Sequence, residues 1–154
     1  MTLLSIAIAL HALAAVVWVG GMAFAYGCLR PVAGRALQTP DRLALWQGVF
    51  ARFFPIVWVA IGLLLVSGYY MTLGPLGGFA IVGAHIHVMQ ALGLLMMAVF
   101  AHLFFAPWRR FRRAVERDER ETASGELERI RRRVAVNLVL GLIVVIVGSS
   151  GRYW

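Results

Sequence analysis

The sequence predicts an all-α integral membrane protein, an up-down bundle of four transmembrane helices. Two observations lead to this prediction. Of the 154 residues, 61% are hydrophobic and 14% are charged, whereas soluble domains are about 45–50% apolar and about 25% charged. A soluble fold of this length could not bury so much apolar surface. In addition, four apolar runs are long enough, or nearly so, to cross a hydrocarbon layer of about 30 Å, which takes about 20 helical residues.

The apolar runs set the expected order of elements. We expect helices over residues 3–27, 53–73, 81–106 and 134–150, with long connections over 28–52 and 107–133 and a tight turn near 74–80. All of them form one predicted transmembrane domain, 1–154. Thr39-Pro40-Asp41 is typical of a helix start, so the second helix should begin near Pro40, with a kink at Pro55.

Basic residues are distributed unequally among the connections. All fifteen are Arg; ten lie in 107–133 and four in 28–52, while the turn at 74–80 carries no charge. Because positive charge stays in the cytoplasm, we expect both long connections inside and both termini on the periplasmic side of a bacterial inner membrane. The same pattern indicates a lipid bilayer as the partner and argues against nucleic acid.

Ionisable side chains within a membrane are costly and mark candidate functional sites. All four histidines lie in apolar runs, and these runs contain no Asp, Glu or Lys. Histidine without carboxylate is typical of an imidazole-ligated metal or haem. The four candidates are His11 in the first run and His85, His87 and His102 in the third.

Depth decides which histidines can act together. In an up-down bundle His11 and His87 differ in depth by only about 3 Å, so we predict that both ligate one haem iron. His102 lies about 22 Å deeper than His87, which leaves it for a possible second metal site. His85 points about 200° away from His87 and is predicted to hydrogen-bond a propionate, or to accept copper or protons. The reverse assignment of His85 and His87 stays open.

Neighbouring side chains complete the predicted cofactor site. Trp18 and Met22 share the helical stripe of His11, and Ala91 follows His87 on a stripe that ends at His102. Small residues beside each His would leave room for a flat macrocycle, although they are also how membrane helices pack closely. Arg152 is expected to pair with a propionate or a lipid phosphate. Asn137 is expected to donate a hydrogen bond between helices.

A copper site is the alternative reading of the same residues. It would use His85, His87 and His102 together with methionines, since thioethers bind Cu(I). Methionine is also ordinary packing material. The methionines concerned are Met22, Met71, Met89, Met96 and Met97.

Short motifs in the first three helices resemble a known family. The segment 10–22, LHALAAVVWVGGM, is similar to the first-helix signature of the copper-resistance protein D (CopD) family and of HemJ-type protoporphyrinogen oxidases. The run from His87 to His102, followed by WRRF at 108–111, and the RFF at 52–54 fit the same pattern.

This resemblance implies two functions. HemJ-type proteins are four-helix proteins that hold haem b, and they typically carry a Lys two residues after the third-helix His. Here that position is Met89, which argues against protoporphyrinogen oxidation. The CopD family is associated with copper uptake or export.

From the residues and the resemblance we expect a haem b protein that transfers electrons, or acts as an oxidoreductase, at the periplasmic side. A quinone or a redox protein would be its partner, and the small-residue faces would suit a homo-oligomer. The alternative is a copper-handling transporter or copper-binding protein.

Overall fold

The computed structural model describes residues 2–153, apart from the side chain of Arg152. Every regular element in this range is helical. Four helical stretches are long and apolar enough to cross a membrane: Leu3–Ala36, Thr39–Leu73, Ala84–Glu116 and Arg120–Ser150. The chain is thus a multi-pass membrane protein, and the prediction of an all-α membrane bundle is confirmed.

The helices extend well beyond the apolar runs, and the second begins at Thr39, next to the expected start at Pro40. The elements are α1 (Leu3–Phe24), η1 (Ala25–Leu29), α2 (Arg30–Ala36), α3 (Thr39–Leu73), α4 (Ala84–Leu103), η2 (Phe104–Trp108), α5 (Arg109–Glu116), α6 (Arg120–Ser150) and η3 (Gly151–Tyr153). The predicted connections 28–52 and 107–133 are therefore mostly helix. The hydropathy pattern marks the part of a helix that lies in lipid, not the point where the helix ends. Each helix continues into the charged sequence because its backbone hydrogen bonds form within the helix in that part as well.

Two π-helical turns, η1 and η2, join the apolar helices to their arginine-rich extensions. Pro31 is the second residue after η1, and Pro107 lies inside η2. Proline lacks the N–H that an α-helix needs and crowds the carbonyl four residues earlier, so the helix locally widens instead of ending. The two extensions therefore remain parts of long continuous rods.

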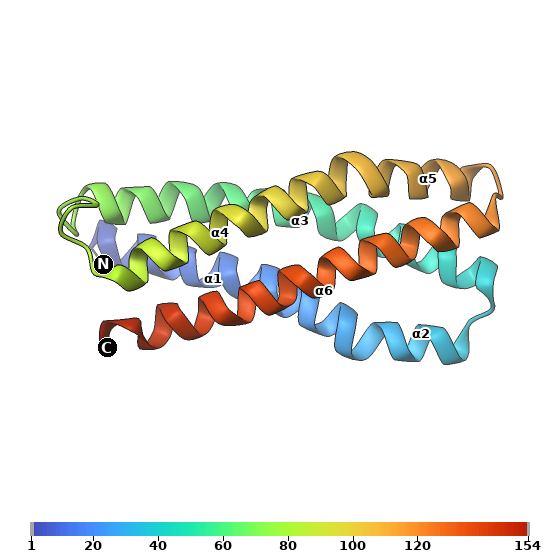
Figure 1. Cartoon of the computed structure of the whole chain (residues 1–154), viewed down its shortest axis with the longest axis horizontal. Helices are drawn as coiled ribbons and strands as arrows, with labels where there is room; N and C mark the ends of the chain where they lie inside the picture. Colours follow the sequence, from blue (N-terminus) through green and yellow to red (C-terminus); the bar gives the residue numbers. More distant parts are fainter. Residues whose placement is uncertain (1, 154) are drawn as a thin grey trace.

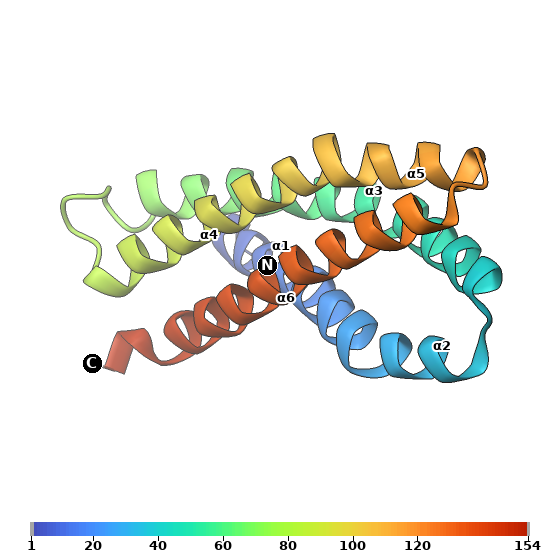
Figure 2. The same cartoon turned by 45° about the vertical axis from the view of Figure 1, so that its right-hand side comes forward.

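The four rods form an up-down bundle. Figure 1 shows the described ends of the chain at the same end of the bundle as the α3–α4 turn. In Figure 2, the α2–α3 and α5–α6 connections lie together at the other end, which we call the arginine-rich end. The α3–α4 turn contains Gly77 and Gly78 at φ 81° and 95°, a backbone conformation that glycine adopts without strain.

Packing pairs α1 with α3 and α4 with α6, and α1 also contacts α6. Within the bundle, the Asn137 amide of α6 donates to the Met96 carbonyl of α4 over 3.1 Å, which confirms the predicted interhelical bond. Toward the arginine-rich end, buried Glu126 of α6 pairs with Arg129 at 2.6 Å and with Arg110 of α5 at 3.7 Å. This carboxylate fixes the two extensions against each other.

Aromatic rings fill the core of the arginine-rich half. Phe54 stacks on Phe50 at 5.0 Å between centroids and meets Trp108 edge-on at 5.3 Å. Phe100 and Phe111 extend this cluster toward α4 and α5. Edge-to-face and offset contacts of this kind are favourable ring geometries, so this half is the tightly packed part of the molecule.

Candidate metal site

A pocket of about 430 Å³ lies in the other half of the bundle, between α1, α3, α4 and α6. Its walls are mainly apolar, and Leu76 and Phe79 of the α3–α4 turn line one end. Nearby, the Gln90 amide of α4 donates to the Tyr69 hydroxyl of α3 over 3.0 Å. The pocket therefore reaches toward the end of the bundle that carries the termini.

His11 is the histidine that lines this pocket within the described residues. Its Nδ1 lies 2.9 Å from the Ser67 hydroxyl of α3. A Cβ added to Gly68 would lie 3.2 Å from Cε1 of the His11 ring. Gly68 thus makes room for the imidazole, and Ser67 orients it.

The Ser67 contact also determines the tautomer of His11. Ser67 donates its single hydroxyl hydrogen to the Leu63 carbonyl, so it can only accept from His11. Nδ1 must then carry the proton, which leaves the lone pair of Nε2 free. Metal-ligating histidines are usually oriented in this way, with the second nitrogen donating to a neighbouring group.

Four methionine thioethers line the same pocket. They belong to Met71 of α3 and to Met89, Met96 and Met97 of α4. An added Cβ on Gly148 would lie 2.9 Å from Met89 Cε, and one on Gly141 would lie 3.1 Å from Met96 Cε. The two glycines of α6, seven residues apart, therefore let two methionines of α4, also seven apart, approach closely. The sequence left these methionines as either Cu(I) ligands or packing material, and the matched seven-residue spacing of glycines and methionines is the pattern that indicates the inner face.

Trp18 also lines the pocket, as expected from its position on the stripe of His11. Its ring meets Phe100 of α4 edge-on at 6.1 Å. Met22, one turn further, is buried but does not line the pocket. The pocket thus ends at the Trp18–Phe100 contact, where the aromatic core begins.

The structure does not bring His87 to the pocket with His11. His87 is exposed on α4, with its ring 6.1 Å from that of Phe79. Ala91, on the same stripe, is also exposed. The expected small-residue stripe of α4 therefore points out of the bundle, while Met89 and Met96 occupy the inner face. Their predicted roles as ligand and cofactor contact stay predictions.

The remaining predicted residues lie elsewhere. His85 is half-buried at the start of α4, with its side chain against Gly151. His102 lies beyond the aromatic contact, where its Nε2 is 3.1 Å from the Arg133 guanidinium. The side chain of Arg152 lies outside the described residues. Among the residues that were described, no three His, Cys, Asp or Glu side chains form a metal-binding group.

The fold and the pocket define a four-helix membrane protein with an intramembrane pocket lined by one imidazole and four thioether groups. A model of the copper resistance protein D (CopD) family matches residues 47–150. This is more than half of the chain, and the chain belongs to that family: it is a copper-resistance-related membrane protein. No curated protein and no solved structure matches it.

The family match differs in extent from the resemblance noted in the sequence. It begins within α3 and runs to the end of α6, so it includes the fourth apolar run and omits the first. The four pocket methionines fall inside the matched range, whereas His11 precedes it.

Proposed function

We propose that this chain binds copper(I) in the pocket between α1, α3, α4 and α6 and hands it on as a copper carrier of the membrane. The observation that carries the proposal is the meeting of one oriented imidazole with four thioethers in one pocket. Soft thioether ligands select Cu(I), and imidazole also binds copper.

The pocket chemistry suits a cuprous ion. No carboxylate lines the pocket within the described residues, and a site of neutral ligands carries less penalty for a monovalent than for a divalent cation in a dry environment. His11 Nε2 would be the nitrogen ligand, with Met89, Met96, Met97 and Met71 as candidate sulfur ligands. Copper would enter from the end that carries the termini, because the aromatic core fills the opposite half.

Copper(I) affinity tests the proposal directly. Purified full-length protein is titrated with Cu(I) against a chromophoric chelator. We expect His11→Ala, and Met89→Leu combined with Met97→Leu, to weaken binding at least about tenfold, as loss of a metal-site group does. Leucine is close to methionine in volume, so such changes cost little in packing.

Met22→Leu is the matched control, because Met22 is buried but outside the pocket. It should bind copper as the unchanged protein does. Equal affinity in His11→Ala and the unchanged protein, or an equal loss in Met22→Leu, would refute the proposed site.

Haem b is the second candidate, and one observation favours it. A pocket of about 430 Å³ is larger than an ion needs and falls within the range of cofactor sites. His87, the second predicted ligand, does not line this pocket. Met71 or Met89 would have to supply the second axial ligand, as in His/Met haem proteins.

The visible spectrum separates the two candidates. A bound haem would serve electron transfer to a quinone or redox protein, and the protein from haem-replete cells would show a sharp Soret band and split visible bands after reduction. A colourless protein that binds stoichiometric copper would eliminate haem. We expect the colourless protein.

A further inference from the structure

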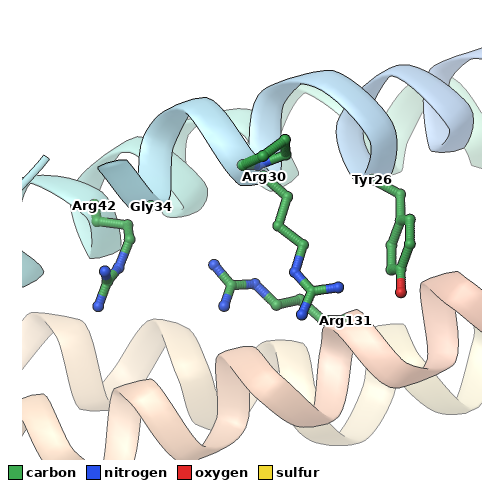
Figure 3. A pocket seen from close by; sticks show the side chains of 6 residues that line it. Tyr26, Arg30, Gly34, Arg42 and Arg131 are labelled. Atoms are coloured by element: carbon green, nitrogen blue, oxygen red, sulfur yellow. The ribbon is translucent and has the colours of Figure 1, made fainter. Parts of the chain in front are cut away.

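A second pocket, of about 350 Å³, lies at the arginine-rich end of the bundle. It is separate from the proposed copper site, and an inference about it does not depend on that proposal. Side chains from η1, α2, α3 and α6 surround it (Figure 3). The lining residues are Tyr26, Arg30, Pro31, Gly34, Arg42 and Arg131.

Three guanidinium groups face this pocket. Figure 3 shows the Arg30 and Arg131 side chains extending toward each other from facing helices, with Arg42 pointing into the same gap. Arg30 lies over the Tyr26 ring at 5.0 Å, and Arg131 lies over the Trp46 ring at 5.5 Å. Stacking uses the flat face of a guanidinium and leaves its N–H edge free to donate.

The positive charge in this pocket is poorly compensated. Within the described part of the chain, Arg30 and Arg42 make no ion pair; Arg42 bonds only the Thr39 hydroxyl at 3.4 Å. Arg131 contacts one carboxylate, Glu128, at 3.7 Å. Arg131 Nε is buried and has no hydrogen-bond partner among the described residues.

An unpartnered buried donor among three like charges is an unfavourable arrangement for the protein alone. An anion with several acceptor oxygens would offset the positive charge and accept hydrogen bonds from the guanidinium groups that face the pocket. We infer that this pocket binds the phosphate group of an anionic ligand between Arg30, Arg42 and Arg131. Arginine forks match phosphate oxygens in geometry, and basic pockets between membrane helices bind anionic lipid head groups.

A lipid head group and free phosphate share this chemistry, so the test has one arm for each. Full-length protein is placed in phosphatidylcholine nanodiscs that carry an increasing fraction of phosphatidylglycerol, and bound phosphatidylglycerol is counted by native mass spectrometry. In parallel, inorganic phosphate is added to protein in phosphatidylcholine alone, and the shift of the melting temperature is recorded.

Arg131→Gln, Arg30→Gln and Arg42→Gln remove one pocket charge each. Arg132→Gln is the matched control: Arg132 is adjacent on α6, highly exposed, and paired at 3.9 Å with the same Glu128. We expect Arg131→Gln to weaken binding about tenfold or more, because a hydrogen bond to a charged group is worth at least that factor. The control should bind like the unchanged protein.

A second measurement guards against misfolding. Without phosphate or anionic lipid, Arg30→Gln should melt at or above the temperature of the unchanged protein, because it relieves repulsion; with the ligand present it should melt lower. Arg131→Lys retains the charge but loses the fork and should bind with intermediate affinity.

Each outcome either supports or overturns phosphate binding in this pocket. Saturable binding of phosphatidylglycerol alone, lost in Arg131→Gln, identifies a lipid head group; binding of inorganic phosphate with the same loss identifies a soluble phosphate. Absence of binding in both arms would overturn the inference. So would equal binding by the unchanged protein and all three pocket variants, or an equal loss in Arg132→Gln.

Discussion

The two halves of the bundle are packed in different ways. In the arginine-rich half, Phe54, Trp108 and Phe111 are at most 5% exposed and contact one another through their rings or shared neighbours. In the half that carries the termini, glycines of α6 contact methionines of α4, and both line a pocket of about 430 Å³. Aromatic rings are rigid and pack in few arrangements, whereas the flexible methionine side chain adjusts its conformation to its neighbours. We expect the aromatic half to contribute most of the stability of the fold and the pocket half to be the part that can accept a ligand.

The largest expected effect concerns which side of the membrane each half faces. The arginine-rich connections predict that the pocket half is periplasmic. A reporter that works only in the periplasm should be active when fused after Trp154 and inactive when inserted near Gly125. The opposite pattern would place the pocket at the cytoplasmic side and reverse the proposed direction of copper entry.

Removal of a core ring should show that the aromatic half contributes more to the free energy of unfolding than lipid-facing side chains do. Phe54→Ala removes a ring with contacts to several others and should lower the free energy of unfolding by on the order of 3 kcal/mol. Phe24→Ala, at a ring 61% exposed, should cost far less. Unfolding in detergent measures both, and equal losses would show that the aromatic half is not the stabilising one.

Ser67→Ala should affect binding more than folding. It removes the group that orients His11 and fixes its tautomer, and loss of such a group typically lowers metal affinity about 10–100-fold. Ser149→Ala is the control, because the Ser149 hydroxyl bonds only carbonyls of its own helix, Val145 at 2.8 Å and Ile146 at 3.1 Å. Similar Cu(I) affinity in the two variants would contradict the role of Ser67.

The smallest effects should come from the two glycines of α6. A Cβ on Gly141 would lie 2.8 Å from Val19 Cγ2, a stiff side chain, so Gly141→Ala should destabilise by about 1–3 kcal/mol. A Cβ on Gly148 would meet the flexible end of Met89, so Gly148→Ala should be nearly neutral. Thermal melts in detergent compare them, and a reversed order would argue against the packing described here.

The membrane-spanning helices and their bundle could be predicted because a long apolar run in lipid must form a helix to pair its backbone groups. The inner face of α4 could not, because a membrane helix is apolar on every side and hydropathy does not mark the side that packs. The small residues beside His87 predicted that its stripe faces inward. In the structure the inner face of α4 carries Met89 and Met96, which lie opposite Gly148 and Gly141. The arginine-lined pocket could not be predicted for another reason: its arginines come from three separate helices.

The central claim is that His11 and the pocket methionines together hold copper. X-ray absorption at the copper edge of Cu(I)-loaded protein tests it most directly, since it counts sulfur and nitrogen neighbours of the metal. We predict a first shell of thioether sulfur with one imidazole nitrogen, and loss of the imidazole signal in His11→Ala. A shell of nitrogen and oxygen alone, or an imidazole signal that persists in His11→Ala, would contradict the account.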